Sequence, residues 1–457
     1  MRIVLCVPNF RWVDNDKNAL WHYLPYNLCI LAACLRQSGF NDISIVDAYK
    51  QDMSMEKLHS VLRQLSPDVV GITVLMDKYG PSGHMVAKIA KDMGAITVMG
   101  GVYASMNAEE VIKDENIDYV VKGEGEYTLS YLLATLGEKR VLQGTKVTDL
   151  DMLPLPAYDL IDLPSYLVSA ERTSVDSPLV LPYGRILTSR GCPFGCCFCQ
   201  VEQITGKEFR ARSPVNIINE IQWLKDMYGI KSLIFDDDNL LTDRGRAEEL
   251  FKLMIERDLN MPWLMIATAA FKLDNRLITL MRDSGCEYVN IAIESGNERV
   301  LHKIINKPIN LEYAKEMVKL LQQAGIYVAV NFIVGFPTET WDEIRESLAF
   351  ADELNADYTK IFAAMPLRNT RLWDMCVKED CFKKDFNGVV QWSKGQIETK
   401  DFTANDLTIL RAYEWERINF TSNEKRSRTC KMMHISEEEL LQIRRQTLLQ
   451  SHQAITI

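Results

Sequence analysis

The chain has 457 residues, enough for two or three domains with substantial cores and too many for a single small module. Its formal net charge of −10 offers no broad basic surface, which argues against a nucleic-acid partner. Eleven cysteines, scattered and odd in number, are atypical of a secreted disulfide framework and favour a reducing, cytoplasmic setting.

Residues 1–143 alternate short β-rich runs with helical stretches, which predicts an α/β domain with a doubly wound, Rossmann-like parallel sheet. The loops that follow strands form the ligand crevice of such a sheet, and here several of them are rich in glycine. A nucleotide-binding Rossmann domain would carry G-x-G-x-x-G after its first strand, and none stands there. The expected strands are Ile3–Val7, Ile43–Asp47, Val69–Val74, Ile96–Gly100 and Tyr119–Val121.

Residues 144–184 are studded with proline and aspartate and show little periodicity, which predicts a surface linker. A short motif follows it: Cys192, Cys196 and Cys199 stand at C-x3-C-x2-C spacing in a loop turned by glycine and proline. Three thiolates at this spacing can hold a [4Fe–4S] cluster and leave one iron open for chemistry. Structural zinc normally takes four ligands in paired spacing, and no second Cys or His pair stands nearby; Cys197, adjacent to Cys196, is expected to point elsewhere.

Residues 185–385 show a second alternation of strands and helices, which suggests a partial, TIM-like (β/α)6 barrel with its active site at the carboxyl ends of the strands. One polar loop, Asp236–Asp238, could bind a cationic or hydroxylated ligand or could cap the next helix, and we expect it to do both. The expected strands are Ile186–Ser189, Ser232–Phe235, Trp263–Thr268, Tyr288–Ile293, Tyr327–Ile333 and Thr359–Ala363.

Residues 386–457 form a helical C-terminal region, with helices expected at Leu407–Ile418 and Glu437–Leu449. Two tryptophans, Trp392 and Trp415, could line a substrate pocket, although buried packing is the commoner role of Trp. The arginines of this region are expected to form a solvated helical face: Arg411, Arg417, Arg426, Arg428, Arg444 and Arg445.

The cysteine triad, with Phe198 before its last member, resembles the signature of radical S-adenosylmethionine (radical SAM) enzymes. The resemblance implies that SAM chelates the open iron and is cleaved to a 5′-deoxyadenosyl radical. It extends over roughly residues 185–372, where the SAM contacts implied are Phe198, Asp237, Asp238, Glu294, Ser295, Gly335 and Pro337.

Two positions depart from the pattern of this family. Thr268-Ala269-Ala270 stands where relatives often place an arginine, so one contact to the SAM carboxylate is in doubt. Asn369 stands where glycine is usual; because Asn tolerates the left-handed region, the turn is expected to survive and Arg368 to point at the cavity.

The glycine loops of residues 1–143 resemble the cobalamin-binding domain found upstream of many radical SAM domains. This chain lacks the D-x-H-x-x-G motif near Asp14 and Asp16, so the cobalt is expected to have no histidine ligand. Methylthiotransferases carry a second cluster on N-terminal cysteines, but core packing is the favoured role here for Cys6, Cys29 and Cys34. The implied cobalamin contacts are Pro8, Asn9, Thr73, Tyr79, Gly100, Gly101, Tyr103, Ser105, Gly123, Glu124, Gly125 and Glu126.

Together these resemblances imply a cobalamin-dependent radical SAM methyltransferase, which moves a methyl group from methylcobalamin to an unactivated carbon or phosphorus centre after hydrogen abstraction. The alternatives are a rearrangement, cyclisation or oxidation with the same cofactors, and a non-catalytic binding module. The expected partners are a small-molecule substrate and an electron donor such as flavodoxin or ferredoxin. A membrane partner is not expected, because the chain contains neither about 18 consecutive apolar residues nor a signal peptide.

Overall fold

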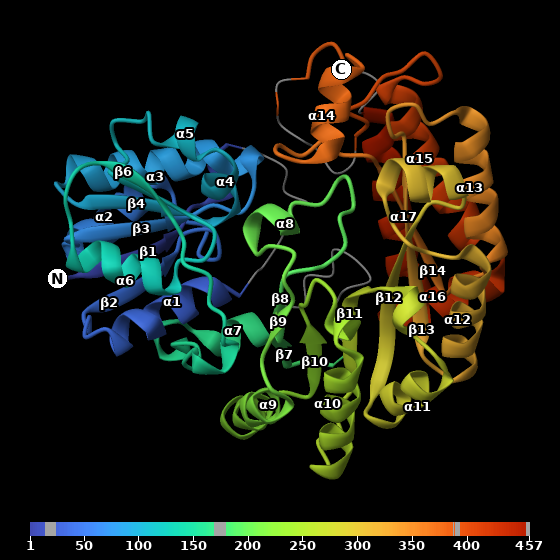
Figure 1. The fold of residues 1–457 in the computed structure, drawn as a ribbon, viewed down its shortest axis with the longest axis horizontal. Helices are drawn as coiled ribbons and strands as arrows, with labels where there is room; N and C mark the ends of the chain where they lie inside the picture. Colours follow the sequence, from blue (N-terminus) through green and yellow to red (C-terminus); the bar gives the residue numbers. More distant parts are fainter. Residues whose placement is uncertain (14–23, 169–179, 387, 389–393, 454–457) are drawn as a thin grey trace. The chain divides into compact units, whose positions relative to one another are not determined.

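The computed structural model describes residues 1–13, 24–168, 180–386, 388 and 394–453. The chain divides into two compact units (Figure 1). Unit 1 comprises residues 1–173, 201–206 and 210–212, and unit 2 comprises residues 174–200, 207–209 and 213–457. The segment predicted as a linker is thus shared between them, and the C-terminal helices belong to the same unit as the second sheet.

Unit 1 is built on a six-stranded parallel sheet of order β2-β1-β3-β4-β5-β6. The five expected strands are present, and β6 is an additional edge strand. Their apolar, β-branched runs suit a sheet that is covered on both faces. The strands are β1 (Ile3–Val7), β2 (Ile43–Asp47), β3 (Val69–Thr73), β4 (Ile96–Gly100), β5 (Tyr119–Lys122) and β6 (Arg140–Gln143).

The helices of unit 1 cover the two faces of this sheet (Figure 1). α1 (Tyr26–Gln37) and α6 (Glu126–Ala134) form the core of one face, while α2 (Met55–Leu65) and α3 (Gly80–Asp92) pack on the other. Three cysteines are buried in this unit, and burial raises the pKa of Cys29 to about 12, which confirms the core role expected of Cys6, Cys29 and Cys34. Shorter elements complete it: α4 (Gly101–Met106), α5 (Ala108–Val111), α7 (Leu163–Leu167), α8 (Val201–Ile204) and β9 (Arg210–Ala211).

Unit 2 contains a six-stranded parallel sheet whose order follows the chain, β7-β10-β11-β12-β13-β14. β7 and β14 are its two free edges, so it is an open, partial barrel of the expected kind. The first strand ends where it was predicted to begin, and Ser189–Arg190 form a separate short strand, β8. The strands are β7 (Tyr183–Ile186), β10 (Ser232–Phe235), β11 (Trp263–Thr268), β12 (Cys286–Glu294), β13 (Tyr327–Val334) and β14 (Tyr358–Ala363).

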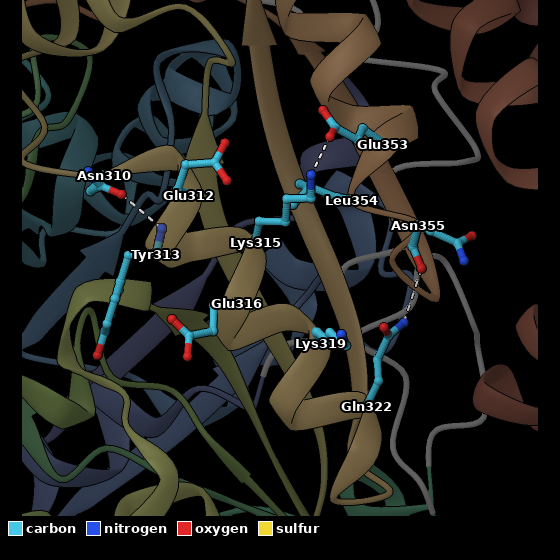
Figure 2. A pocket seen from close by; sticks show the side chains of 10 residues that line it. All are labelled: Asn310, Glu312, Tyr313, Lys315, Glu316, Lys319, Gln322, Glu353, Leu354 and Asn355. Atoms are coloured by element: carbon cyan, nitrogen blue, oxygen red, sulfur yellow. Dashed lines mark hydrogen bonds and ion pairs between the residues drawn. The ribbon is translucent and has the colours of Figure 1, made fainter.

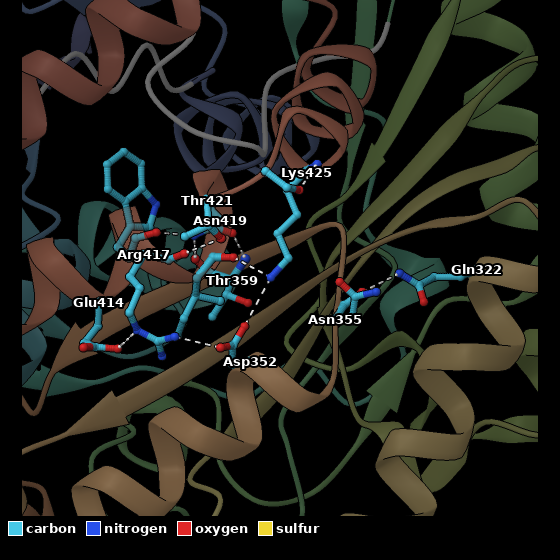
Figure 3. A network of polar contacts seen from close by, with 12 residues as sticks. Gln322, Asp352, Asn355, Thr359, Glu414, Arg417, Asn419, Thr421 and Lys425 are labelled. Atoms are coloured by element: carbon cyan, nitrogen blue, oxygen red, sulfur yellow. Dashed lines mark hydrogen bonds and ion pairs between the residues drawn. The ribbon is translucent and has the colours of Figure 1, made fainter.

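α9 to α13 follow the strands of unit 2 and lie along one face of its sheet (Figure 1). Two of the last three helices were predicted, and α16 was not. α15 packs along β14, where the Asn419 side chain takes the place of a neighbouring strand: Thr359 N donates to Asn419 Oδ1 at 2.7 Å, and Asn419 Nδ2 donates to Thr359 O at 2.8 Å (Figure 3). The helices are α9 (Pro214–Tyr228), α10 (Arg244–Glu256), α11 (Asn275–Asp283), α12 (Leu311–Gln323), α13 (Trp341–Glu353), α14 (Arg371–Lys378), α15 (Ala404–Phe420), α16 (Asn423–Met433) and α17 (Glu437–Gln453).

Candidate active site

The three spaced cysteines lie in the loop after β8, and all three are partly exposed. Cys199 N donates to Cys196 O at 3.1 Å, a turn that brings the backbones of the last two cysteines close together. Burial raises the pKa values of Cys192 and Cys196, and the nearby Lys307 ammonium opposes this rise. A cation beside thiols of this kind favours the thiolate form that iron requires.

Cys197 is buried, unlike the three spaced cysteines. It is 1% exposed, its N–H donates to Ile305 O at 2.9 Å, and its carbonyl accepts from Leu372 N at 2.8 Å. Burial raises the pKa of its thiol to about 12. Cys197 therefore behaves as a small core residue, which leaves the other three as the donor set.

The donor set fits a cluster better than a single ion. In the described residues, no group of three or more His, Cys, Asp or Glu side chains is gathered closely enough to hold one metal ion. Thiolates on separate corners of a cube bind different irons and do not have to meet at one point. Cys192, Cys196 and Cys199 would hold such a cluster, although their ligation is still a prediction.

The aspartate loop after β10, Asp236–Asp238, was expected to cap the next helix as well as to bind a ligand, and it does not cap that helix. Asp236 pairs with Arg185, and the buried Asp237 accepts from Thr188 Oγ1 at 2.7 Å and from Ser189 Oγ. None of the three caps the next helix; Asp243 caps α10 instead, because the loop continues through a 3-10 turn at Leu240–Thr242 before α10 begins.

Asp238 is the exposed residue of this loop. Partial enclosure by protein and the neighbouring Asp237 raise its pKa to about 6. A carboxylate so placed at the carboxyl end of a barrel strand could accept hydrogen bonds from a ligand. Its contact with SAM, like that of Asp237, stays a prediction.

The end of β12 turns sharply at Glu294. Its φ is +76°, and its carboxylate accepts from Lys307 Nζ at 2.8 Å with both side chains largely buried. The next residue, Ser295, is 0% exposed and lies 2.8 Å, Oγ to Oγ, from Ser347 of α13. Glu294 thus faces the cation beside the cysteines, whereas Ser295 fixes the loop to a helix.

The loop after β13 is held by a buried acid. Glu339 Oε2 accepts from Gly335 N at 2.6 Å and from Phe336 N at 2.9 Å, and burial raises its pKa to about 7. Gly335 has φ +89°, and a Cβ there would lie 2.3 Å from Leu407 Cδ1 of α15. Phe336 lies 6.3 Å, centroid to centroid, from the half-buried Phe198 of the cysteine loop. Pro337 follows in the same loop.

The two positions that depart from the pattern of the radical SAM family lie at the end of β11 and after β14. At the end of β11, Thr268 Oγ1 is buried without a hydrogen-bond partner, while Phe271 packs edge-on against Phe194 of the cysteine loop at 4.9 Å. Asn369 has φ +61°, which confirms that the turn survives. The Arg368 guanidinium lies 4.9 Å from the ring centroid of Trp373, which attracts it, and its direction toward the cavity stays a prediction.

In unit 1, the carboxyl ends of the strands carry the predicted cobalamin contacts. Asn9, after Pro8, is 2% exposed and its amide donates to Asp52 Oδ1 and Met53 O, both at 3.0 Å. Tyr79 stacks on Phe10 at 4.3 Å, and Thr73 Oγ1 accepts from Asn27 Nδ2 at 3.0 Å. These side chains stabilise the loops; their contacts with a ligand stay predictions.

The glycine loops after β4 and β5 form a cradle of backbone that comprises Gly100, Gly101, Ser105 and Gly123. Gly101 has φ +87°, and a Cβ there would lie 2.7 Å from Val74 O, so the position requires glycine. At Gly100 a Cβ would meet only Val121 O, at 3.8 Å. Ser105 Oγ donates to Gly101 O at 2.8 Å and accepts from Gly123 N at 2.9 Å, which joins the two loops. This open, hydrogen-bonded backbone fits close approach of a bulky cofactor such as cobalamin.

Tyr103 lies between this cradle and α3. Its hydroxyl is 3.0 Å from His84 Nε2, and His84 Nδ1 is 2.5 Å from Asp114 Oδ2. A Cβ at Gly80 would lie 2.6 Å from the Tyr103 ring. The region of the missing D-x-H-x-x-G motif, Asp14 and Asp16, lies outside the described residues.

Glu124 forms a buried ion pair that the sequence did not reveal. Both of its oxygens accept from Arg210, one of them at 3.0 Å from Nη1, and Val147 N donates to Oε2 at 2.8 Å. The side chains are 5% and 3% exposed. The two residues that follow Glu124 have other surroundings. Gly125 packs near Leu31, and Glu126 is a buried residue in the first turn of α6.

The C-terminal helices confirm the commoner role expected of Trp415 and correct the expectation for the arginines. Trp415 is 7% exposed and donates from Nε1 to Tyr358 Oη at 2.8 Å, so it packs in the core; Trp392 lies outside the described residues. The arginines do not form one solvated face: Arg428 pairs with the buried Asp357, Arg444 with Glu416, and Arg417 with Asp352 and Glu414 (Figure 3). The tertiary packing of α15–α17 supplies these partners, which periodicity cannot show.

A groove of about 720 Å³ opens on α12, and no predicted site residue lines it (Figure 2). It is lined by charged and amide side chains such as Lys315 and Glu353, which pair with each other. An open, charged surface of this kind lacks the apolar enclosure of a small-molecule site. None of the described helices combines the length and the hydrophobicity that a membrane span requires.

The comparisons with known proteins agree with this geometry. The model of the radical SAM superfamily matches residues 186–351, and that of the B12 binding domain matches residues 20–133. A solved structure, the cobalamin-dependent S-adenosylmethionine radical enzyme OxsB with aqua-cobalamin and S-adenosylmethionine bound, shares the fold. Its TM-score is 0.72 at 15% identity, over 99% of this chain and 80% of that one.

Several relatives are similar over most of their length. An uncharacterized methyltransferase of Pyrococcus horikoshii is 30% identical, over 84% of this chain and 85% of its own. The cytidylyl-2-hydroxyethylphosphonate methyltransferase of Streptomyces wedmorensis is 27% identical over 78% of each chain. The anaerobic magnesium-protoporphyrin IX monomethyl ester cyclase of Rubrivivax gelatinosus is 26% identical, over 78% of this chain and 66% of its own.

Proposed function

Because this chain belongs to the radical SAM superfamily and is a cobalamin-dependent enzyme of that superfamily, we propose that it transfers a methyl group from SAM to an unactivated carbon or phosphorus centre of a small molecule. When bound, cobalamin carries the methyl group, and the [4Fe–4S] cluster supplies the electron that cleaves SAM into the hydrogen-abstracting radical. Everything else in the reaction depends on how this chain binds, orients and shields the reactants.

Three features of unit 2 provide that positioning. Cys192, Cys196 and Cys199 would hold the cluster, beside the Lys307–Glu294 pair. The exposed Asp238 would accept hydrogen bonds from the amino or hydroxyl groups of SAM. Gly335, kept in its left-handed conformation by Glu339, would present backbone rather than a side chain to the ligand.

In unit 1, the cradle at Gly100 would receive the cofactor, and Ser105 keeps its two loops together. The Glu124–Arg210 pair holds β9, which follows the cysteine loop in sequence, to the glycine loop after β5. The single observation that carries the proposal is the partly exposed triad of thiols in a chain that also has this open cradle.

The relatives support methyl transfer as the outcome, since two of those described above are named methyltransferases and the one at 30% identity covers most of the chain. A phosphonate substrate in one relative is the reason to retain phosphorus as a possible acceptor. The second candidate is a cyclisation or oxidation without methyl transfer, favoured by the cyclase of Rubrivivax gelatinosus. A non-catalytic role is disfavoured by the intact triad.

We further propose that the enzyme works in the cytoplasm, where a flavodoxin or ferredoxin would supply the electron. Its substrate is a small molecule rather than a nucleic acid, in keeping with the net charge of −10. A reducing compartment would also protect eleven free cysteines.

The test is to incubate the anaerobically reconstituted enzyme with trideuteromethyl-labelled SAM, a reductant and a small-molecule extract. Methyl transfer predicts a product that carries the labelled methyl group, together with both S-adenosylhomocysteine and 5′-deoxyadenosine. Formation of 5′-deoxyadenosine with an unlabelled product would favour the second candidate. Failure of the wild type to form any 5′-deoxyadenosine would support the non-catalytic alternative.

A further inference from the structure

Arg411 of α15 carries a positive charge that the described part of the chain leaves without a counter-ion. Its Nε is enclosed by protein and has no hydrogen-bond partner, and burial lowers the pKa of its guanidinium. Arg417, on the same helix, instead meets two carboxylates at 2.7 and 2.8 Å (Figure 3). The residue as a whole is only partly buried, so its guanidinium is partly desolvated, and a charge left there without a carboxylate costs free energy that the fold has to offset.

The helix directs Arg411 toward the candidate active site. Leu407, Arg411 and Trp415 are spaced four residues apart and therefore lie in one row. Leu407 contacts Gly335 at the carboxyl end of β13, and Trp415 bonds to Tyr358 at the start of β14, so the row runs along the edge of the sheet. Helical side chains tilt toward the helix N-terminus, which for Arg411 is the end at Gly335.

The open face of the sheet beside this row is polar. Asn331 of β13 pairs in register with Lys360 of β14, and both are less buried than Val330 and Ile361 on the opposite face. Asn331 Oδ1 is enclosed without a hydrogen-bond partner. Buried polar atoms of this kind normally have partners in the protein, water or a ligand.

We propose that Arg411 anchors an anionic group of the substrate, a carboxylate or a phosphate-type oxyanion, at the β14 edge of the partial barrel. This inference rests on the proposed function, because it takes the substrate to lie over the carboxyl ends of the strands. A guanidinium offers two parallel N–H donors that match two oxyanion oxygens, and the bound anion would neutralise the partly buried charge. The enzyme would thus select anionic small molecules.

The test measures thermal melting of the anaerobically reconstituted full chain with added sodium acetate or sodium methylphosphonate. Sodium chloride at equal ionic strength is the reference. The variants are Arg411→Met, Arg411→Lys and the matched control Arg417→Met. We expect at least one oxyanion to raise the melting temperature of the wild type and of Arg417→Met in a saturable way. Arg411→Met should require at least tenfold more anion, and Arg411→Lys should fall between the two.

A binding role also predicts that Arg411→Met melts no lower than the wild type without added anion, because the substitution removes an unpaired, partly buried charge. A clear fall in its melting temperature would show a structural role and overturn the proposal. So would an undiminished anion response in Arg411→Met, or no response to either oxyanion in the wild type. Loss of the response in the presence of saturating SAM would assign Arg411 to the SAM carboxylate and would also overturn it.

Discussion

Replacing Arg210 with methionine removes one partner of the buried pair in unit 1. The Glu124 carboxylate would then lose both of its bonds to the guanidinium and retain the Val147 N–H, at 2.8 Å, and Thr205 O would lose its donor, now 2.9 Å from Arg210 Nη2. Breaking a buried ion pair in this way costs about 3–5 kcal/mol. At about 1.4 kcal/mol per factor of ten, local opening should become roughly a hundredfold to several thousandfold more frequent.

Hydrogen exchange measured by mass spectrometry tests this directly. The amides of Thr205 and Gly206 both donate to Val201 O, at 2.9 and 3.1 Å, and should exchange much faster in Arg210→Met. Arg282→Met, which removes an exposed arginine paired with Asp283, is the matched control and should change little. A change below about fivefold in Arg210→Met would refute the reasoning. So would single effects of Glu124→Leu and Arg210→Met that simply add in the double variant.

Three further predictions follow from unit 2. Cys192→Ala, Cys196→Ala and Cys199→Ala should each abolish cluster binding and 5′-deoxyadenosine formation, whereas Cys197→Ala should keep most of both in iron analysis and product chromatography; the reverse pattern for Cys197 and Cys199 would reject the ligand assignment. Gly335→Ala should lower the free energy of unfolding by about 1–3 kcal/mol, because the added methyl group meets Leu407 and the backbone has φ +89°, and an unchanged denaturation midpoint would contradict this. The pKa of Glu339 is about 7 in the folded state and 4.5 in its ordinary, unfolded environment, so between these pH values the folded protein holds a proton that the unfolded chain has lost. The free energy of unfolding of the wild type should therefore fall as the pH rises from 4.5 to about 7. Glu339→Gln lacks this loss, and its stability relative to the wild type should grow by about 3 kcal/mol across that range; a difference that does not vary with pH would exclude the buried acid as its cause.

The strands were largely predictable because short apolar, β-branched runs between turn residues are a local signal. β6 was missed because Arg140–Gln143 is an exposed edge strand without an apolar run. β7 was displaced because Tyr183-Gly184-Arg185-Ile186 is mixed in character and owes its place to pairing with β10.

The site was predictable to the extent that it is local in sequence. Three cysteines within eight residues are a signal that can be seen in the sequence alone. The left-handed turn at Asn369 could also be predicted from the residue type. Arg210 and Arg411 could not be found in this way, because their significance depends on groups far along the chain. Arg210 pairs with Glu124, and Arg411 pairs with no carboxylate among the described residues. The aspartate loop shows the same limit, since Arg185 and Thr188 determine which aspartate stays exposed.

The most direct test of a cobalamin-dependent radical SAM enzyme is to measure how it divides SAM between two products. The wild type, reconstituted anaerobically with cobalamin and reduced, should form both S-adenosylhomocysteine and 5′-deoxyadenosine. Withholding cobalamin should remove the first product, and Cys199→Ala should remove the second. Equal S-adenosylhomocysteine formation without cobalamin, or 5′-deoxyadenosine formation by Cys199→Ala, would contradict the account.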